Sequence, residues 1–168
     1  DELDRMCAQW AGEGYRVFLP DLYWRQGTLR FPVPANREAP FDPAMVCANL
    51  ATTMEMSVAD TRAILERWGG TTPGRCARFG AVGYCMGARH ALAAAARCPD
   101  RLTFTACLHG GRMVSDGPDS PHLLIPQVRG RLYLGFAADD DTCPEEHQAL
   151  LARALVESRV DGQVERFA

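Results

Sequence analysis

Residues 79–97 read FGAVGYCMGARHALAAAAR, and this stretch decides the fold. Its first four residues, 79–82, form a short apolar run bounded by glycine, which predicts a buried strand. Residues 86–97 are nearly all Ala, Leu, Met or Arg, which favour a helix. A strand that turns into a helix within about one residue needs a strained backbone at the turn. We expect the flanking glycines, Gly83 and Gly87, to let strand and helix approach without Cβ clashes.

The residue at this turn is Cys85. Its sulfur is expected to stand above the sheet at the positive end of the following helix, which favours the thiolate, the nucleophilic form of cysteine. A G-x-C-x-G sequence also occurs by chance, in an ordinary turn with a buried structural cysteine. The stretch alone therefore leaves two interpretations of Cys85, a nucleophile and a packed thiol.

The composition is that of an ordinary globular protein, with 47% hydrophobic and 23% charged residues in 168. This length predicts a single domain over residues 1–168. A net charge of −3 gives no reason to expect a nucleic acid or a membrane as partner. The seven cysteines form no C-x-x-C pair and no zinc spacing, which favours reduced thiols and a cytoplasmic location.

Along the chain, strand patterns alternate with helix patterns. We expect helices over residues 1–14, 44–68, 86–97 and from Pro144 onward, the last with Leu150, Leu151, Leu155 and Val156 on its inner face. Strands are expected at residues 15–19, 79–82, 103–108, 131–136 and 163–167, with irregular segments at 21–43 and 112–127. This alternation predicts an α/β fold whose mostly parallel sheet has helices on both faces.

Chemically useful residues follow three of these strands: Cys85, then His109, then Asp139, Asp140 and Asp141. Parallel α/β sheets bind their ligands at the carboxyl ends of the strands. A cysteine nucleophile needs a base, and an acid to orient that base. Asp140 is a suitable acid, whereas Asp139 and Asp141 are expected to be solvated, because three consecutive carboxylates point different ways and rarely hold a metal.

Taken together, the motifs resemble the dienelactone hydrolase family of α/β-hydrolases from end to end. The matching segments are GEGY at 12–15 followed by PDLYWR at 20–25, GYCMG at 83–87, HGG at 109–111, DSPH at 119–122, and the A-x-x-D-x-x-x-P pattern at 137–144. The last three resemble a bacterial branch of the family.

The resemblance implies that Cys85 is the nucleophile, Asp140 the triad acid, and the backbone N–H of Met86 an oxyanion-hole donor. It implies attack on a lactone or ester carbonyl, a thiol-ester intermediate and then hydrolysis, with a small-molecule substrate and no metal or organic cofactor. Arg25 matches a family position and could hold a substrate carboxylate, or form a structural ion pair. Three further candidates for substrate contact lie near the strand ends: Tyr84, His109 and His122.

Two parts of the family pattern are expected outside the sequence. The opening strands would precede Asp1, and the triad histidine would follow Ala168. His90 is expected to pack or cap, and His147 to be solvated. We therefore expect an α/β-hydrolase domain trimmed at both ends, with little activity by itself. Two alternatives remain: a general carboxylesterase, and a non-catalytic binding domain with this fold.

Overall fold

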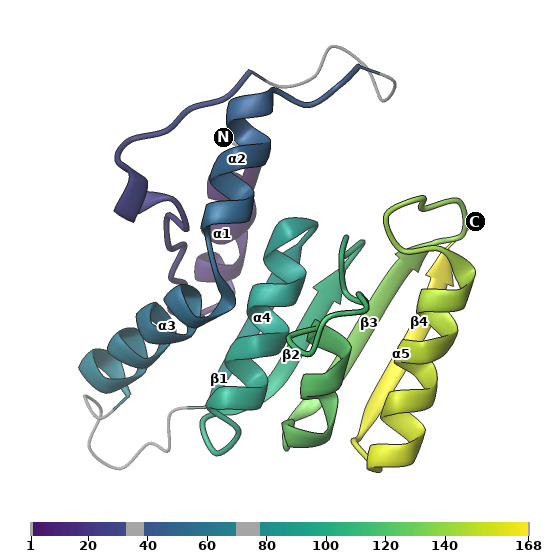
Figure 1. Cartoon of the computed structure of the whole chain (residues 1–168). Coiled ribbons are helices and arrows are strands. Elements are labelled where there is room, and N and C mark those ends of the chain that lie inside the picture. The colour runs from purple at the N-terminus through teal and green to yellow at the C-terminus, as the bar shows by residue number, and fades with distance from the viewer. Residues whose placement is uncertain (1, 33–38, 70–77, 168) are drawn as a thin grey trace. The chain divides into compact units, whose positions relative to one another are not determined.

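The computed structural model describes residues 2–32, 39–69 and 78–167 (Figure 1). The chain divides into two compact units, Asp1–Thr52 and Thr53–Ala168. A single domain over residues 1–168 stays a prediction.

The first unit consists of α1 (Glu2–Gly12), the 3₁₀ helix η1 (Trp24–Gln26) and α2 (Pro43–Ala51). The amide of Gln26 donates to the carbonyl of Ala48 at 3.0 Å and to Thr52 Oγ1 at 2.9 Å, which ties η1 to α2. The prediction of a strand at residues 15–19 is wrong, because this segment forms no strand. A strand needs a neighbouring strand to receive its hydrogen bonds, and the described part of this unit contains none.

The single helix predicted over residues 44–68 is also wrong, since α2 ends at Ala51 and α3 (Met54–Trp68) begins afterwards. Thr52 is extended, with ψ 101°, and Thr53 caps α3 by accepting a hydrogen bond from Met56 N at 3.3 Å. Threonine hydroxyls at helix starts satisfy backbone N–H groups that have no partner within the helix. The apolar pattern continues across this break, so periodicity alone did not reveal it.

The second unit is built on a parallel four-stranded sheet in the order β1-β2-β3-β4. Its strands are β1 (Phe79–Tyr84), β2 (Leu102–Leu108), β3 (Arg131–Ala137) and β4 (Gly162–Phe167). The connections carry α4 (Met86–Arg97), the 3₁₀ helix η2 (Pro121–Gln127) and α5 (Glu145–Ser158), as Figure 1 shows. The predicted strands from residue 79 onward are confirmed, and so is the α/β fold class.

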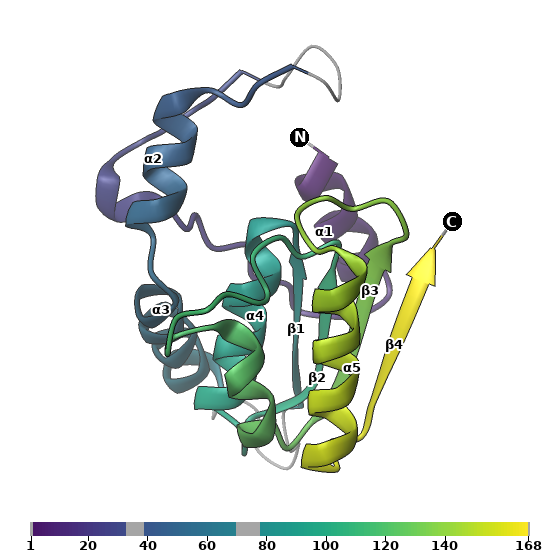
Figure 2. The ribbon, with the colours of Figure 1, turned by 45° about the vertical axis from the view of Figure 1, so that its right-hand side comes forward.

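Helices α4 and α5 lie on the same face of this sheet (Figure 2). The register aligns Gly83, Cys107, Leu134 and Val164 across the four strands, so the side chains of the last three share that face. Cys107 and Leu134 are fully buried there, in a core that also contains Leu92 of α4 and Leu151 of α5. Helical cover on the other face of the sheet stays a prediction.

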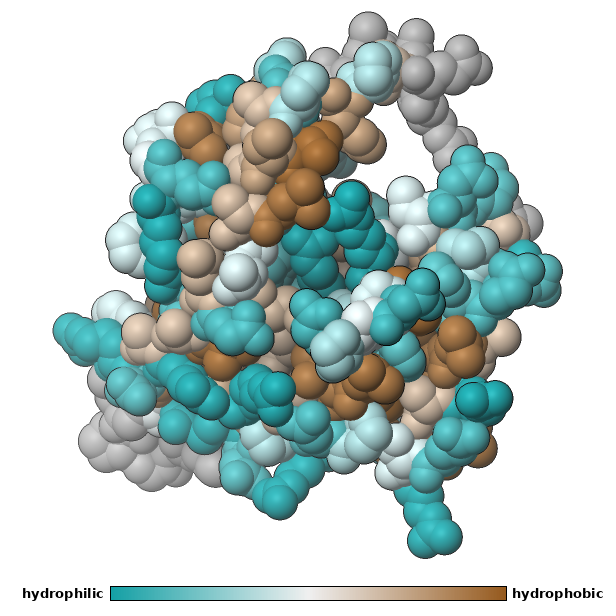
Figure 3. Space-filling view, viewed as in Figure 1, coloured by the Kyte–Doolittle hydropathy of each residue, from teal (hydrophilic) through white to brown (hydrophobic). Residues whose placement is uncertain are grey.

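Helix α5 buries Leu151 and Leu155, two of the four residues predicted on its inner face, and Leu150 is half-buried. Val156, expected on the same face, is 78% exposed, because one residue further turns the side chain about 100° around the helix. Among the described residues, no helix is both long and apolar enough to cross a membrane. Figure 3 shows hydrophilic side chains spread over much of the visible surface, with hydrophobic ones between them.

Candidate active site

The turn between β1 and α4 has the geometry expected from the sequence. Strand β1 ends at Tyr84, α4 begins at Met86, and Cys85 between them has φ 50° and ψ −116°. Positive φ is strained for a residue with a side chain and persists where the surrounding structure enforces it. Cys85 is exposed, so its sulfur is accessible at the start of α4.

The two glycines of this turn have different roles. A Cβ on Gly83 would lie 2.2 Å from the carbonyl oxygen of Gly87, so only glycine fits where β1 meets α4. A Cβ on Gly87 would meet nothing within 4 Å. The expectation that both glycines relieve Cβ clashes is therefore correct for Gly83 and wrong for Gly87, which contributes its backbone to the contact.

Hydrogen bonds between neighbouring strands align the ends of β1, β2 and β3. Cys85 N donates to Leu108 O at 3.0 Å, and His109 N donates to Gly135 O at 2.7 Å. Beyond β3, Ala138 N donates to Phe167 O at 2.7 Å. Cys85, His109 and the segment that follows β3 thus begin side by side at one edge of the sheet. We call residues 138–144 the acid loop, because they carry Asp140.

Tyr84 and His109 lie next to each other beside Cys85. Their rings are tilted by 44°, with centroids 5.8 Å apart. His109 is exposed and has φ 39°, a second strained residue at the same edge. The structure therefore brings these two candidates together with the predicted nucleophile. Their contact with a substrate stays a prediction, as does the oxyanion role of Met86 N–H.

Asp140 has one carboxylate oxygen fixed and one available. Its Oδ1 accepts hydrogen bonds from Thr142 N at 2.9 Å and from Thr142 Oγ1 at 2.6 Å. Within the described part of the chain, Oδ2 accepts none. Asp139 and Asp141 are exposed, as expected for solvated carboxylates. A carboxylate held through one oxygen can orient a neighbouring group through the other.

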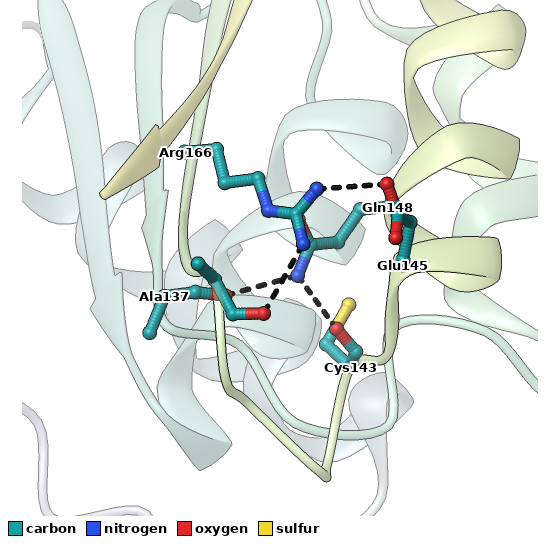
Figure 4. A network of polar contacts seen from close by, with 6 residues as sticks. Ala137, Cys143, Glu145, Gln148 and Arg166 are labelled. Atoms are coloured by element: carbon teal, nitrogen blue, oxygen red, sulfur yellow. Dashed lines mark hydrogen bonds and ion pairs between the residues drawn. The ribbon is translucent and has the colours of Figure 1, made fainter. Parts of the chain in front are cut away.

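Side chains from α5 and β4 hold the acid loop (Figure 4). The amide nitrogen of Gln148 donates to Ala137 O at 3.0 Å and to Cys143 O at 2.8 Å. Arg166 donates to Ala138 O at 3.2 Å and pairs with Glu145 at 2.9 Å. Sequence reasoning missed Gln148. The signal was its spacing with Leu151 and Leu155 at i, i+3 and i+7, which puts a polar residue on the buried face of α5.

His90 and His122 each lie beside a serine hydroxyl. His90 is buried, and its Nδ1 lies 2.9 Å from Ser57 Oγ of α3. Ser57 Oγ donates its own proton to Met54 O, so Nδ1 of His90 carries a hydrogen. Burial, and secondarily the charge of Arg89, lowers the pKa of His90 from 6.5 to about 4. The expectation that His90 packs is confirmed.

His122 Nδ1 lies 2.6 Å from Ser120 Oγ, which also accepts a hydrogen bond from Ser115 N. The pKa of His122 is lowered by burial and by His147 nearby. The prediction that His147 is solvated is wrong for its Nδ1, which is buried without a partner among the described residues. Helix α5, which carries His147, packs against η2, which carries His122. Substrate contact by His122 stays a prediction.

Two other cysteines near this edge are packed thiols, as expected. Cys107 is fully buried and donates to Ala88 O at 3.3 Å, and burial raises its pKa to about 12. Burial, together with the charge of Asp140, raises the pKa of Cys143 to about 11. Neither thiol supplies a thiolate at neutral pH, which leaves Cys85 as the exposed cysteine at this edge.

Arg25 belongs to the first unit, where its guanidinium lies 4.4 Å from the centroid of the Trp24 ring. Its role as a ligand for a substrate carboxylate stays a prediction. In the part of the chain that the structure describes, no group of three or more His, Cys, Asp or Glu side chains could hold a metal ion.

Comparison with solved structures gives the fold. A candidate dienelactone hydrolase from Klebsiella pneumoniae superposes with a TM-score of 0.80 at 20% identity, covering 99% of this chain and 67% of that one. A dienelactone hydrolase-like promiscuous phosphotriesterase from metagenomic libraries gives 0.56 at 18% identity, covering 79% and 54%. A lipase/esterase from Lactobacillus plantarum gives 0.52 at 11%, covering 70% and 60%.

These likenesses show the α/β-hydrolase fold, and the chain spans between about half and two thirds of each of these three proteins. Among curated proteins, none matches the chain. The model of the dienelactone hydrolase family, in contrast, matches residues 1–168. With a cysteine at the strained turn after β1 and an aspartate on the loop after β3, the chain belongs to the dienelactone hydrolase family.

Proposed function

We propose that this chain carries the nucleophile and the acid of a hydrolase that opens a lactone or ester through a thiol ester on Cys85. The observation that carries the proposal is an exposed cysteine, held at positive φ between β1 and α4, in a chain of the dienelactone hydrolase family. The hydrolase names of the similar structures support the same reaction class.

In the proposed reaction, the Cys85 thiolate attacks the carbonyl carbon and a C–S bond forms. Negative charge moves to the carbonyl oxygen, which the N–H of Met86 would stabilise as one oxyanion donor. The C–O bond to the leaving alcohol then breaks, and the alkoxide takes up a proton. The alkoxide receives this proton from the catalytic base. Water then gives a proton to the base as it attacks the thiol ester, the C–S bond breaks, and the free thiolate and a carboxylic acid are released, which loses its proton to solvent.

Asp140 has the features of the acid that orients the base. Its Oδ1 is held by Thr142, and its Oδ2 is available to accept a hydrogen bond from an imidazole N–H. The family resemblance implies an imidazole on a loop after the last strand, so this step rests on the resemblance. His90 does not suit the role, because it is buried against Ser57.

The finer assignment is a lactone hydrolase for small substrates that carry a carboxylate, of the carboxymethylenebutenolidase type, with Arg25 as the predicted carboxylate ligand. The described cysteines are all free, which fits a reducing compartment such as the cytoplasm.

The test is to trap the thiol ester. The full gene product is mixed briefly with p-nitrophenyl acetate, quenched in acid and mapped by mass spectrometry. We expect an acetyl group on Cys85, and loss of ester hydrolysis in Cys85→Ala. Cys47, which is also exposed, serves as the matched control and should stay unmodified. Full hydrolysis by Cys85→Ala, with no acetyl group on Cys85 in the unsubstituted protein, would overturn the proposal.

A further inference from the structure

We propose that Gln148 is a positioning residue, which holds the acid loop so that Asp140 can orient the catalytic base. This inference rests on the proposed function, because it assigns a role to Gln148 through Asp140. It concerns a buried side chain of α5, outside the edge of the sheet that carries Cys85 and His109.

Gln148 closes the acid loop at its base. Its side-chain nitrogen has two hydrogens, and both are used: one bond goes to Ala137 O, where β3 ends, and one to Cys143 O, just before α5. Gln148 is only 6% exposed, so water cannot easily replace it as donor. Two carbonyls, one in a buried contact and one in a half-buried contact, would lose this donor if the amide were removed.

The outer side of the loop is held more weakly. Arg166 donates to Ala138 O and pairs with Glu145, as Figure 4 shows, but both side chains are substantially exposed to solvent. Exposed ion pairs of this kind contribute little to stability. Gln148 is therefore the stronger of the two restraints.

The inner side of the loop faces the segment that follows β2. Arg112 N donates to Thr142 O at 3.4 Å, and a Cβ on Gly111 would lie 3.0 Å from Thr142 Oγ1. Thr142 is also the residue that fixes Oδ1 of Asp140. A shift of the loop base therefore moves the Asp140 carboxylate relative to the edge that carries Cys85. Displacements of about 1 Å at reacting groups can cost about 100-fold in rate.

Gln148→Met tests this in the full gene product, because methionine has a similar length and no hydrogen to donate. We expect kcat to fall about 10- to 100-fold with little change in KM, while the alkylation rate of Cys85 stays the same. Gln127→Met is the matched control: it removes a surface glutamine amide that bonds Arg97, away from the acid loop, and should leave kcat unchanged.

A double-substitution cycle separates positioning from a general structural role. If Gln148 acts through Asp140, Gln148→Met should have no further effect on single-turnover acylation when Asp140 is already alanine. Gln148→Asn keeps the amide but is one methylene shorter, so it should give an intermediate loss. It also decides the matter if Gln148→Met does not fold.

Normal kcat in both Gln148 variants would overturn the inference. The inference would also be overturned if Gln148→Met slowed single-turnover acylation as much in the Asp140→Ala protein as in the unsubstituted one. Gln148→Asn takes its place in this test if the methionine variant does not fold. Failure of the proposed function looks different, since Cys85→Ala and Asp140→Ala would then hydrolyse esters at the unsubstituted rate.

Discussion

Cys85, His109 and Arg112 have positive φ values of 50°, 39° and 57°, and all three follow β1 or β2 at their carboxyl ends. Strained residues of this kind gather where function requires a particular backbone path. For Cys85 the sequence predicted the strain, because a strand and a helix meet there within a single residue. For His109 and Arg112 it did not, since their strain depends on how β2 and β3 are aligned.

At the scale of single residues, the lowered pKa of His90 leads us to expect that acid destabilises the fold. Its pKa is about 4 in the folded chain and 6.5 when exposed, so the unfolded state binds the proton more readily between these values. Neutral, buried His90 therefore makes its full contribution to the free energy of unfolding above pH 6.5, and this contribution is lost as the pH falls towards 4. The loss in the free energy of unfolding should be roughly 3 kcal/mol.

His90→Asn keeps a donor for Ser57 but does not titrate, so urea unfolding of both proteins from pH 4 to pH 7.5 isolates the effect. The unsubstituted protein should lose stability as the pH falls and His90→Asn should not, so the difference between their free energies of unfolding should become smaller towards pH 4. Parallel pH curves for the two proteins would contradict the argument.

At the scale of elements, local sequence patterns predicted β1 to β4, although β4 lies at the edge of the sheet and has no fully buried residue. Local sequence patterns gave wrong predictions where the secondary structure depends on a neighbouring strand or on a helix cap. Residues 15–19 have the composition of a strand but no partner strand in their unit. The break between α2 and α3 depends on the Thr53 cap, a single hydrogen bond that a periodicity argument overlooks.

The contact between β1 and α4 predicts opposite effects for two glycines. Gly83→Ala puts a methyl group against the backbone of Gly87, which cannot yield, and should destabilise the fold by about 3 kcal/mol or more. Gly87→Ala meets nothing and removes a flexible residue from a helix, so it should stabilise by up to about 1 kcal/mol. Urea midpoints of the two variants provide the measurement, and equal destabilisation by both would show that the geometry of this turn is wrong.

At the scale of the whole molecule, the order of motifs along the sequence was enough to indicate the family, and it gave Cys85 and Asp140 as candidates whose roles stay predictions. It could not reveal what holds Asp140 in place. Gln148 bonds a carbonyl eleven residues away, and this contact exists only once α5 packs beside β3. Supporting contacts of this kind depend on tertiary structure, whereas the chemistry of the strand ends is already visible in the residues themselves.

The most direct test of the central claim, that Cys85 is an activated nucleophile, is the rate of alkylation by iodoacetamide. The full gene product is labelled across a range of pH and every cysteine is mapped by mass spectrometry. We expect Cys85 to react much faster than Cys47, which is also exposed, and buried Cys107 to stay unlabelled. Ester hydrolysis should be lost in proportion to the alkylation of Cys85. If Cys85 reacts no faster than Cys47, or if its alkylation leaves hydrolysis intact, Cys85 is not the nucleophile.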